Sequence, residues 1–140
     1  MFTENERNEL KDIVKKSADT GDLDIEVKVN TKDEILDLSS AFQSLLDAMK
    51  AQSKHAEKIA EGDLSIEIET RSENDVLSKN MKYVVETLRQ LIQETEILSE
   101  AASEGNFDTR ADENRFAGGY KDIIHGINNT LDVVVDKVLW

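Results

Sequence analysis

The sequence has no cysteine and no proline, and aromatic residues make up only 5% of it. Without cysteine there is no disulfide and no thiolate metal site, and a reducing compartment is permitted. The lack of proline favours long helices, and the few aromatic side chains offer little material for a wide globular core. No apolar run approaches the ~20 residues that a membrane-spanning helix needs, and the polar, acidic start MFTENERNEL predicts no secretory signal. These absences favour a helical protein with narrow apolar seams.

Negative charge dominates what is present. The net charge is -13, and charged residues make up 34% of the 140 residues. Such a surface repels the phosphates of nucleic acids and of anionic lipids, so neither is expected as a partner. We expect the acidity to keep an elongated, partly apolar assembly in solution.

Three glycines mark an internal repeat. Gly21, Gly62 and Gly105 follow helical stretches, and their positions give periods of 41 and 43 residues. Each repeat has the same order: a short helix, a glycine that ends it, an extended link of about a dozen residues and a longer helix. The pattern predicts three units, residues 1–50, 51–92 and 93–140.

The links after the glycines alternate apolar and polar residues. The alternating apolar positions are Leu23, Ile25, Val27 and Val29 in the first link, and Leu64, Ile66 and Ile68 in the second. Two interpretations remain open. The favoured one is an extended connector that packs its apolar side chains on the helices, and the other is a β-strand, which would leave an exposed edge.

Two long segments, 35–59 and 77–102, carry apolar residues in steps of three and four. The seam positions are Ile35, Leu38, Phe42, Leu45, Met49, Gln52, Ala56 and Ile59 in the first, and Leu77, Met81, Val84, Leu88, Leu91, Thr95, Leu98 and Ala102 in the second. This is a heptad pattern, which predicts a left-handed coiled coil, and the third unit closes with a similar seam from Ile124 to Val138. Gln52 and Thr95 are the polar members. They either fix the register or loosen the bundle, or they are simply tolerated in wet packing.

A long helix cannot bury its seam against itself. Two copies of the chain with two helices each would form a four-helix bundle, so the seams predict a homodimer. About a dozen extended residues reach up to ~40 Å, enough to return along a 16-residue helix of ~24 Å. The two helices of one unit are therefore predicted to run parallel.

The repeated motifs resemble a known family. GDLDIEV and GDLSIEI resemble the start of the connector of HAMP domains, the signal-relay modules of chemoreceptors and sensor kinases, and DEILDLSSAFQSLLDAMK (33–50) resembles the opening of the second HAMP helix. The resemblance makes Gly21, Gly62 and Gly105 the connector glycines. It gives the connector anchors as Leu23, Val27, Leu64, Ile68, Phe107 and Ala111, and the acidic start of the second helix as Asp33, Glu34 and Glu73.

The resemblance implies an all-α fold of parallel homodimeric four-helix bundles, three units stacked through continuous helices and joined by extended connectors. The implied function is a relay that passes a conformational signal between input and output domains of a longer prokaryotic chemoreceptor or sensor histidine kinase, by switching helix packings. The implied location is cytoplasmic, in a free or membrane-anchored parent protein. A passive coiled-coil stalk and a ligand-binding helical bundle are the alternatives.

The third unit diverges from this pattern. RFAGGYKDIIHGINNTLDVVV has no acidic pair at its helix start, and the connector carries Thr109 and Ala111 where the second connector has Ile66 and Ile68. We therefore predict that the third unit holds its connector least tightly.

No catalytic residue, cofactor, metal site or small-molecule substrate is predicted. His55 and His125 lie 70 residues apart, which is no zinc-site spacing, and neither has the context of a phosphate-accepting histidine. The acidic stretches fail the calcium-loop pattern, which needs glycine at its sixth position. They are interpreted as helix caps and solvated faces, and an enzyme is not expected.

Overall fold

A computed structural model describes residues 3–27 and 34–138, without the side chains of Glu34 and Ile35. This part of the chain is helical and contains no β-strand, which confirms the all-α prediction. The connectors are extended and do not form strands within the described residues, so the favoured interpretation of the alternating links holds there. The elements are α1 (Glu4–Thr20), α2 (Glu34–Ala60), α3 (Val76–Ser103), the 3-10 helix η1 (Glu113–Arg115) and α4 (Gly118–Val138).

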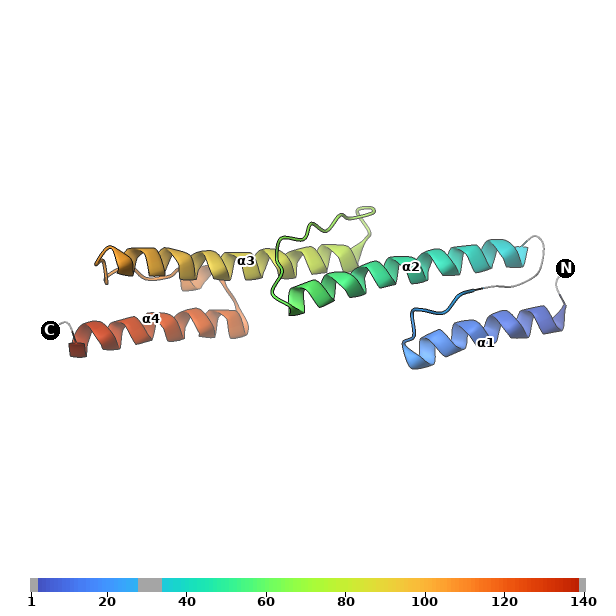
Figure 1. Cartoon of the computed structure of the whole chain (residues 1–140), viewed down its shortest axis with the longest axis horizontal. Coiled ribbons are helices and arrows are strands. Elements are labelled where there is room, and N and C mark those ends of the chain that lie inside the picture. Colours follow the sequence, from blue (N-terminus) through green and yellow to red (C-terminus); the bar gives the residue numbers. More distant parts are fainter. Residues whose placement is uncertain (1–2, 28–33, 139–140) are drawn as a thin grey trace. The chain divides into compact units, whose positions relative to one another are not determined.

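The chain divides into two compact units, Met1–Ile66 and Glu67–Trp140. The boundary falls inside the predicted second repeat, 51–92, so the threefold division stays a prediction. Within the first unit, α1 and α2 run in the same direction, and within the second unit α3 and α4 do so too (Figure 1). Each shorter helix is thus joined to its longer neighbour by a connector that returns along it, as the reach of the links predicts.

The two long helices are continuous. α2 has 27 residues and α3 has 28, against the predicted segments 35–59 and 77–102. Neither contains proline or glycine, so nothing in the sequence interrupts the backbone hydrogen bonds. At 1.5 Å per residue each is roughly 40 Å long.

Glycines end three of the helices in the left-handed conformation. The φ angles are 73° at Gly21, 84° at Gly62 and 83° at Gly105. The second and third ends are alike: the glycine N–H donates to the carbonyl three residues back, and the next N–H donates to the carbonyl five residues back. This is the Schellman arrangement, which satisfies helix-end carbonyls and strongly favours glycine. Helices therefore end at the three glycines where the sequence predicts stops.

Each unit has its own small core. In the first unit Leu10 is buried and packs with Val14 and the connector residue Val27. In the second unit the buried cluster is larger and joins α3, the connector and α4. Its members are Leu98, Ala111, Phe116 and Ile124, flanked by Leu91, Ile127 and Leu131. In both units a connector residue thus contributes to the core.

The predicted seam of α2 is not the face that packs within the chain. Leu38, Leu45 and Met49 are 58%, 51% and 42% exposed. Their neighbours Ser39 and Leu46, one residue further along the helix, are buried. A step of one residue is about 100° around a helix. The chain's own packing therefore centres on the face of Ser39 and Leu46 and leaves Leu38, Leu45 and Met49 of the seam largely uncovered, whereas the seam residues Phe42, Gln52 and Ile59 are half-buried.

Candidate functional site

The first connector is held by a side chain from α2. The backbone N–H of Val27 donates to Oε1 of Gln43 at 3.0 Å. Gln43 in turn donates from Nε2 to Asp47 at 3.1 Å, which fixes its orientation. An ion pair of 3.3 Å between Lys50 and Asp24 adds a second, solvent-exposed link, of the kind that contributes little stability. The predicted anchor Val27 is thus held by a hydrogen bond as well as by apolar contact.

The start of the first connector is fastened to α1. Ser17 is buried, and its hydroxyl donates to the carbonyl of Asp22 at 2.9 Å. The N–H of Gly21 donates to the carbonyl of Ser17. The predicted anchor Leu23 follows this turn and is half-buried. Ser17 therefore fixes the direction in which the chain leaves α1.

The second connector carries its predicted anchors in more sheltered positions. Leu64 is half-buried and Ile68 is buried. At the turn, Oδ1 of Asp63 accepts hydrogen bonds from the hydroxyl and the N–H of Ser65. These bonds hold the pKa of Asp63 below its ordinary value. The turn after Gly62 is therefore reinforced locally.

The second connector ends at a cap that the sequence reasoning missed. Asp75 is the N-cap of α3, where its carboxylate accepts from the N–H of Ser78 at 3.2 Å and from the guanidinium of Arg71 at 3.2 Å. The hydrogen bond from Arg71, followed by that from Ser78, lowers the pKa of Asp75 strongly. Glu73, the predicted acidic start, is exposed and lies before the helix. An aspartate directly before the apolar Val76 was the available signal.

The third connector is hydrogen-bonded to Asn128 of α4. The N–H of Ala111 donates to Oδ1 of Asn128, and Nδ2 of Asn128 donates to the carbonyl of Ala111, both at 2.9 Å. Ala111 and Asn128 are both buried. One carboxamide thus satisfies both backbone groups of a buried connector residue.

A buried carboxylate of α3 holds the same connector from the other side. Glu94 accepts from the N–H of Asp112 at 3.2 Å and from the guanidinium of Arg115 at 2.6 Å. The Glu94 side chain is 6% exposed, so the ion pair and the backbone bond together compensate its loss of water. The connector therefore lies between a carboxylate on α3 and a carboxamide on α4.

Polar contacts continue along α4. Nδ1 of His125 lies 2.9 Å from Oε1 of Glu113, and the same oxygen accepts from Asn128 at 3.3 Å. The hydrogen bond with His125, and then that from Asn128, lowers the pKa of Glu113. Arg110 donates to Asp132 at 2.9 Å. These contacts join the 3-10 helix η1 and the connector to one side of α4.

The third connector differs from its predicted form in the residues that secure it. Phe107, the predicted first anchor, is 37% exposed, while Phe116 near the connector's end is buried. Ala111, the predicted second anchor, is buried, and its small side chain accompanies the close approach of Asn128. The prediction of a loose connector considered apolar side chains alone and missed the hydrogen bonds.

Other predicted residues lie as follows. Gln52 is half-buried, with its Oε1 3.4 Å from Nδ1 of His55. Thr95 is exposed and donates to the carbonyl of Ile92 in its own helix. Asp33 and the side chain of Glu34 lie outside the described residues.

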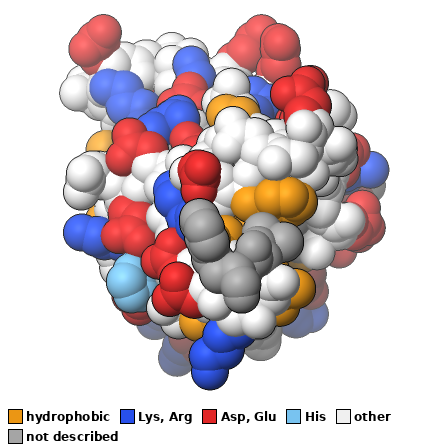
Figure 2. Space-filling model, turned by 90° about the vertical axis from the view of Figure 1, so that its left-hand side faces the viewer, with side chains coloured by type: hydrophobic (Ala, Val, Ile, Leu, Met, Phe, Trp, Pro, Cys, Tyr) orange, Lys and Arg blue, Asp and Glu red, His pale blue; other side chains and the backbone are white. Residues whose placement is uncertain are grey.

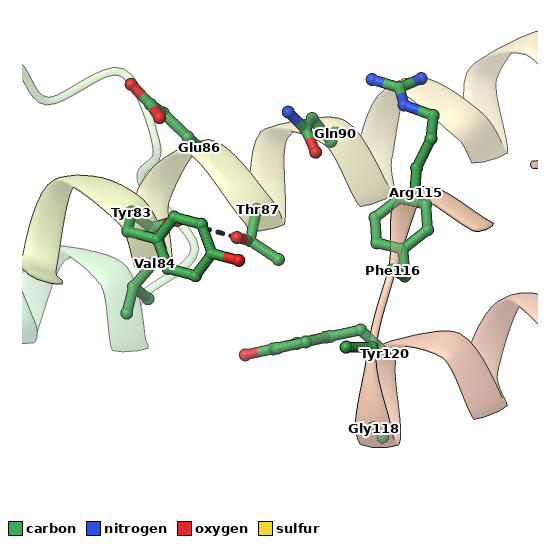
Figure 3. Close-up of a pocket in the computed structure, with 11 residues that line it drawn as sticks. Tyr83, Val84, Glu86, Thr87, Gln90, Arg115, Phe116, Gly118 and Tyr120 are labelled. Carbon is green, nitrogen blue, oxygen red and sulfur yellow. Dashed lines mark hydrogen bonds between the residues drawn. The ribbon is translucent and has the colours of Figure 1, made fainter. Parts of the chain in front are cut away.

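A cavity of about 450 Å³ lies between α3 and the turn into α4 (Figure 3). The rings of Tyr83 and Tyr120 line it, whereas the carboxylate of Glu86 and the guanidinium of Arg115 point away from it. A ligand site needs polar groups that converge on the bound molecule. This arrangement does not favour the ligand-binding alternative.

Two further features are absent from the described residues. They contain no cluster of three or more histidine, aspartate or glutamate side chains placed to hold a metal ion. None of their helices combines the length and the hydrophobicity that crossing a membrane requires.

Comparison with known proteins gives one positive finding. Neither the curated proteins nor the solved structures yield a match. A family model does match, and HAMP domains are signal-transduction linkers of sensor proteins. The segment 8–51, which contains most of α1, the first connector and much of α2, matches the HAMP domain family.

Proposed function

We propose that the chain is a tandem array of three HAMP-like units that relays a conformational signal between input and output domains of a longer, cytoplasmic or membrane-anchored receptor. The match of residues 8–51 to the HAMP domain carries this proposal. The proposed units are 1–50, 51–92 and 93–140, and the module has no catalytic role.

The recurrence of one local design supports extension beyond the matched segment. Three helices end at glycines of positive φ, at periods of 41 and 43 residues, and each is followed by an extended connector and a new helix. The ends at Gly62 and Gly105 share the same hydrogen-bond pattern. A structure repeated at this period is typical of modular arrays.

The exposed seam supports a homodimer. Leu38, Leu45 and Met49 form a stripe along α2 that the chain itself leaves open. Apolar residues at heptad spacing are the positions through which coiled-coil helices pack on each other. A second copy presents the same stripe, so two copies cover each other's seams in a parallel four-helix bundle.

The surface argues against nucleic acid and anionic lipid as partners. The net charge is -13. On the described part of the face shown in Figure 2, acidic side chains lie among the basic ones. Binding to phosphate groups requires a concentrated positive area, because neutralisation of phosphates supplies most of the affinity. The proposed partners are a second copy and the domains attached to the array.

The proposed mechanism is a choice between two packings of similar free energy in each unit. Packed interfaces switch between discrete arrangements rather than deform continuously, so rotation or tilt in one unit becomes a defined signal for the next. The continuous helices α2 and α3 extend across the proposed unit boundaries at 50/51 and 92/93. A change in one unit therefore reaches its neighbour through a shared helix.

The test compares two leucine substitutions in an intact receptor that contains the array. Leu64→Ala removes a half-buried connector anchor, whereas Leu36→Ala removes an exposed leucine of α2 outside the seam. The relay predicts that Leu64→Ala shifts the signalling output while the receptor stays dimeric, and that Leu36→Ala changes neither. Unchanged output in a dimeric Leu64→Ala receptor would instead favour a passive stalk.

A further inference from the structure

Two connectors are held by the same chemical device on different helices. In the first, the carboxamide of Gln43 accepts from the N–H of Val27. In the third, the carboxamide of Asn128 accepts from the N–H of Ala111 and also donates to its carbonyl. Val27 and Ala111 each stand six residues after the connector glycine. The device therefore recurs at the equivalent connector position.

The helix positions are also similar, because Gln43 lies 22 residues after Gly21 and Asn128 lies 23 residues after Gly105. Each carboxamide lies four residues after a buried residue of its helix, and the same offset can be applied to α3. The buried residues are Ser39, Ser78 and Ile124, and the residues four positions later are Gln43, Lys82 and Asn128. An ammonium group donates hydrogen bonds but cannot accept one. Lys82 therefore cannot receive a connector N–H as Gln43 and Asn128 do.

We propose that the two hydrogen bonds of Asn128 fix the rotation of α4 about its own axis relative to the third connector. Gln43 has the same role, with one bond, in the first unit. This inference rests on the proposed relay function. The corresponding residue of the second unit is Lys82, whose side chain cannot accept such a hydrogen bond.

The geometry explains why these hydrogen bonds resist rotation of α4. Side-chain atoms at the surface of a helix lie ~5 Å from its axis, so a rotation of about 30° moves them by about 3 Å. Such a shift takes both 2.9 Å bonds of Asn128 beyond hydrogen-bonding distance. The buried N–H and carbonyl of Ala111 would then lose their partner, which is strongly unfavourable. Small rotations are therefore resisted, and a large one releases the connector.

The test uses Asn128→Ala with Asn129→Ala as its matched control, because Asn129 is the next residue and is exposed. Two quantities are measured in the whole chain: hydrogen exchange of the Ala111 amide, and the positions of strongest inter-chain cross-linking for single cysteines introduced from 130 to 138. Asn128→Ala is expected to speed the exchange about tenfold or more. It should also move the cross-linking maximum along α4, whereas Asn129→Ala should do neither.

Two further variants keep the test decisive. Asn128→Gln retains the carboxamide, as the first unit does, and should keep the cross-linking maximum in place. Asn128→Asp has nearly the same size but loses the donor and places a negative charge beside Glu113, so it should move the maximum even if Asn128→Ala does not fold. If the cross-linking maximum stays in place in both Asn128→Ala and Asn128→Asp, the proposed role of Asn128 is overturned and the relay function is not. If the cysteine variants that retain Asn128 give no cross-links, both the proposed dimer and the proposed role of Asn128 are overturned.

Discussion

Two adjacent leucines of α2 allow the chain's own packing to be separated from the proposed dimer contact. Leu46 is 1% exposed and belongs to the face that packs within the chain, whereas Leu45 is 51% exposed and belongs to the seam. The perturbation is the same at both positions, leucine to alanine. We expect Leu46→Ala to weaken folding of each chain, and Leu45→Ala to weaken mainly the association of two chains.

The magnitudes follow from burial. Truncating a fully buried leucine such as Leu46 costs about 2–5 kcal/mol of the free energy of unfolding. Leucine to alanine removes about three methylene equivalents at ~0.8 kcal/mol each, so covering the exposed half of Leu45 contributes about 1.2 kcal/mol per chain. Two copies give about 2.4 kcal/mol per dimer, or roughly a 50-fold change in Kd.

The assay measures association and unfolding separately. Analytical ultracentrifugation over a range of protein concentrations gives the Kd of the dimer, and urea unfolding at one high concentration gives the unfolding midpoint. Leu45→Ala should raise the Kd about 50-fold with a modest shift in midpoint. Leu46→Ala should lower the midpoint at every concentration.

One pattern of results would refute this reasoning. If Leu45→Ala left the Kd unchanged while Leu46→Ala raised it, the dimer would use the face that the structure assigns to intrachain packing. The seam would then have been assigned to the wrong contact.

Three further predictions concern the helix ends and the polar contacts. Gly126 lies inside α4 with open space around an added Cβ, so Gly126→Ala should raise the free energy of unfolding by about 1 kcal/mol. Gly62 has a φ of 84°, so Gly62→Ala should lower the free energy of unfolding by about 1–2 kcal/mol. Equal shifts of the two variants in urea unfolding would contradict this prediction. The pKa of Glu113 is lowered in the folded chain, so its carboxylate stabilises the fold above its ordinary pKa of 4.5, and this stabilisation is lost as pH falls through the lower folded pKa. The melting temperature of Glu113→Gln should therefore depend less on acid pH than that of the unsubstituted chain. Parallel curves of melting temperature against pH would contradict this prediction. Asp75→Ala should speed hydrogen exchange in the first turn of α3, because the capping oxygen is lost. Asp75→Ser keeps a capping oxygen and should exchange more slowly than Asp75→Ala. Equal exchange in the two variants would show that the cap is unimportant.

The helices could be predicted closely from the sequence because their signals are local. The seam pattern from 35 to 59 becomes a helix over Glu34–Ala60, and Gly21, Gly62 and Gly105 end helices in the conformation that glycine favours. Each of these features depends on residues a few positions apart. The extended form of the described connector residues followed from the same local reasoning.

The partner of each helix face could not be predicted in this way. A heptad pattern identifies an apolar face but does not say which helix covers it. Leu46 and Ser39, outside the predicted seam, are the residues buried by the chain itself. The seam residues Leu38, Leu45 and Met49 are exposed, and no second copy of the chain is present to cover them, so the dimer remains a prediction.

The polar contacts of the third connector were missed because they join residues far apart in the sequence. Asn128 bonds to a residue 17 positions away, and Glu94 bonds to one 21 positions away. A signal for Glu94 exists, since it lies eleven residues before its connector glycine, where the first unit has the buried Leu10. A charged residue at a core position requires a partner, and Arg115 provides it.

Inter-chain disulfide mapping along α2 tests the central claim most directly. The chain has no native cysteine, so single cysteines placed one at a time from 36 to 59 report without interference. A parallel dimer through the seam predicts the strongest cross-links at positions 38, 45 and 49 and weak ones at 39 and 46. Cross-links that peak at 39 and 46, or that are absent throughout, would contradict the account.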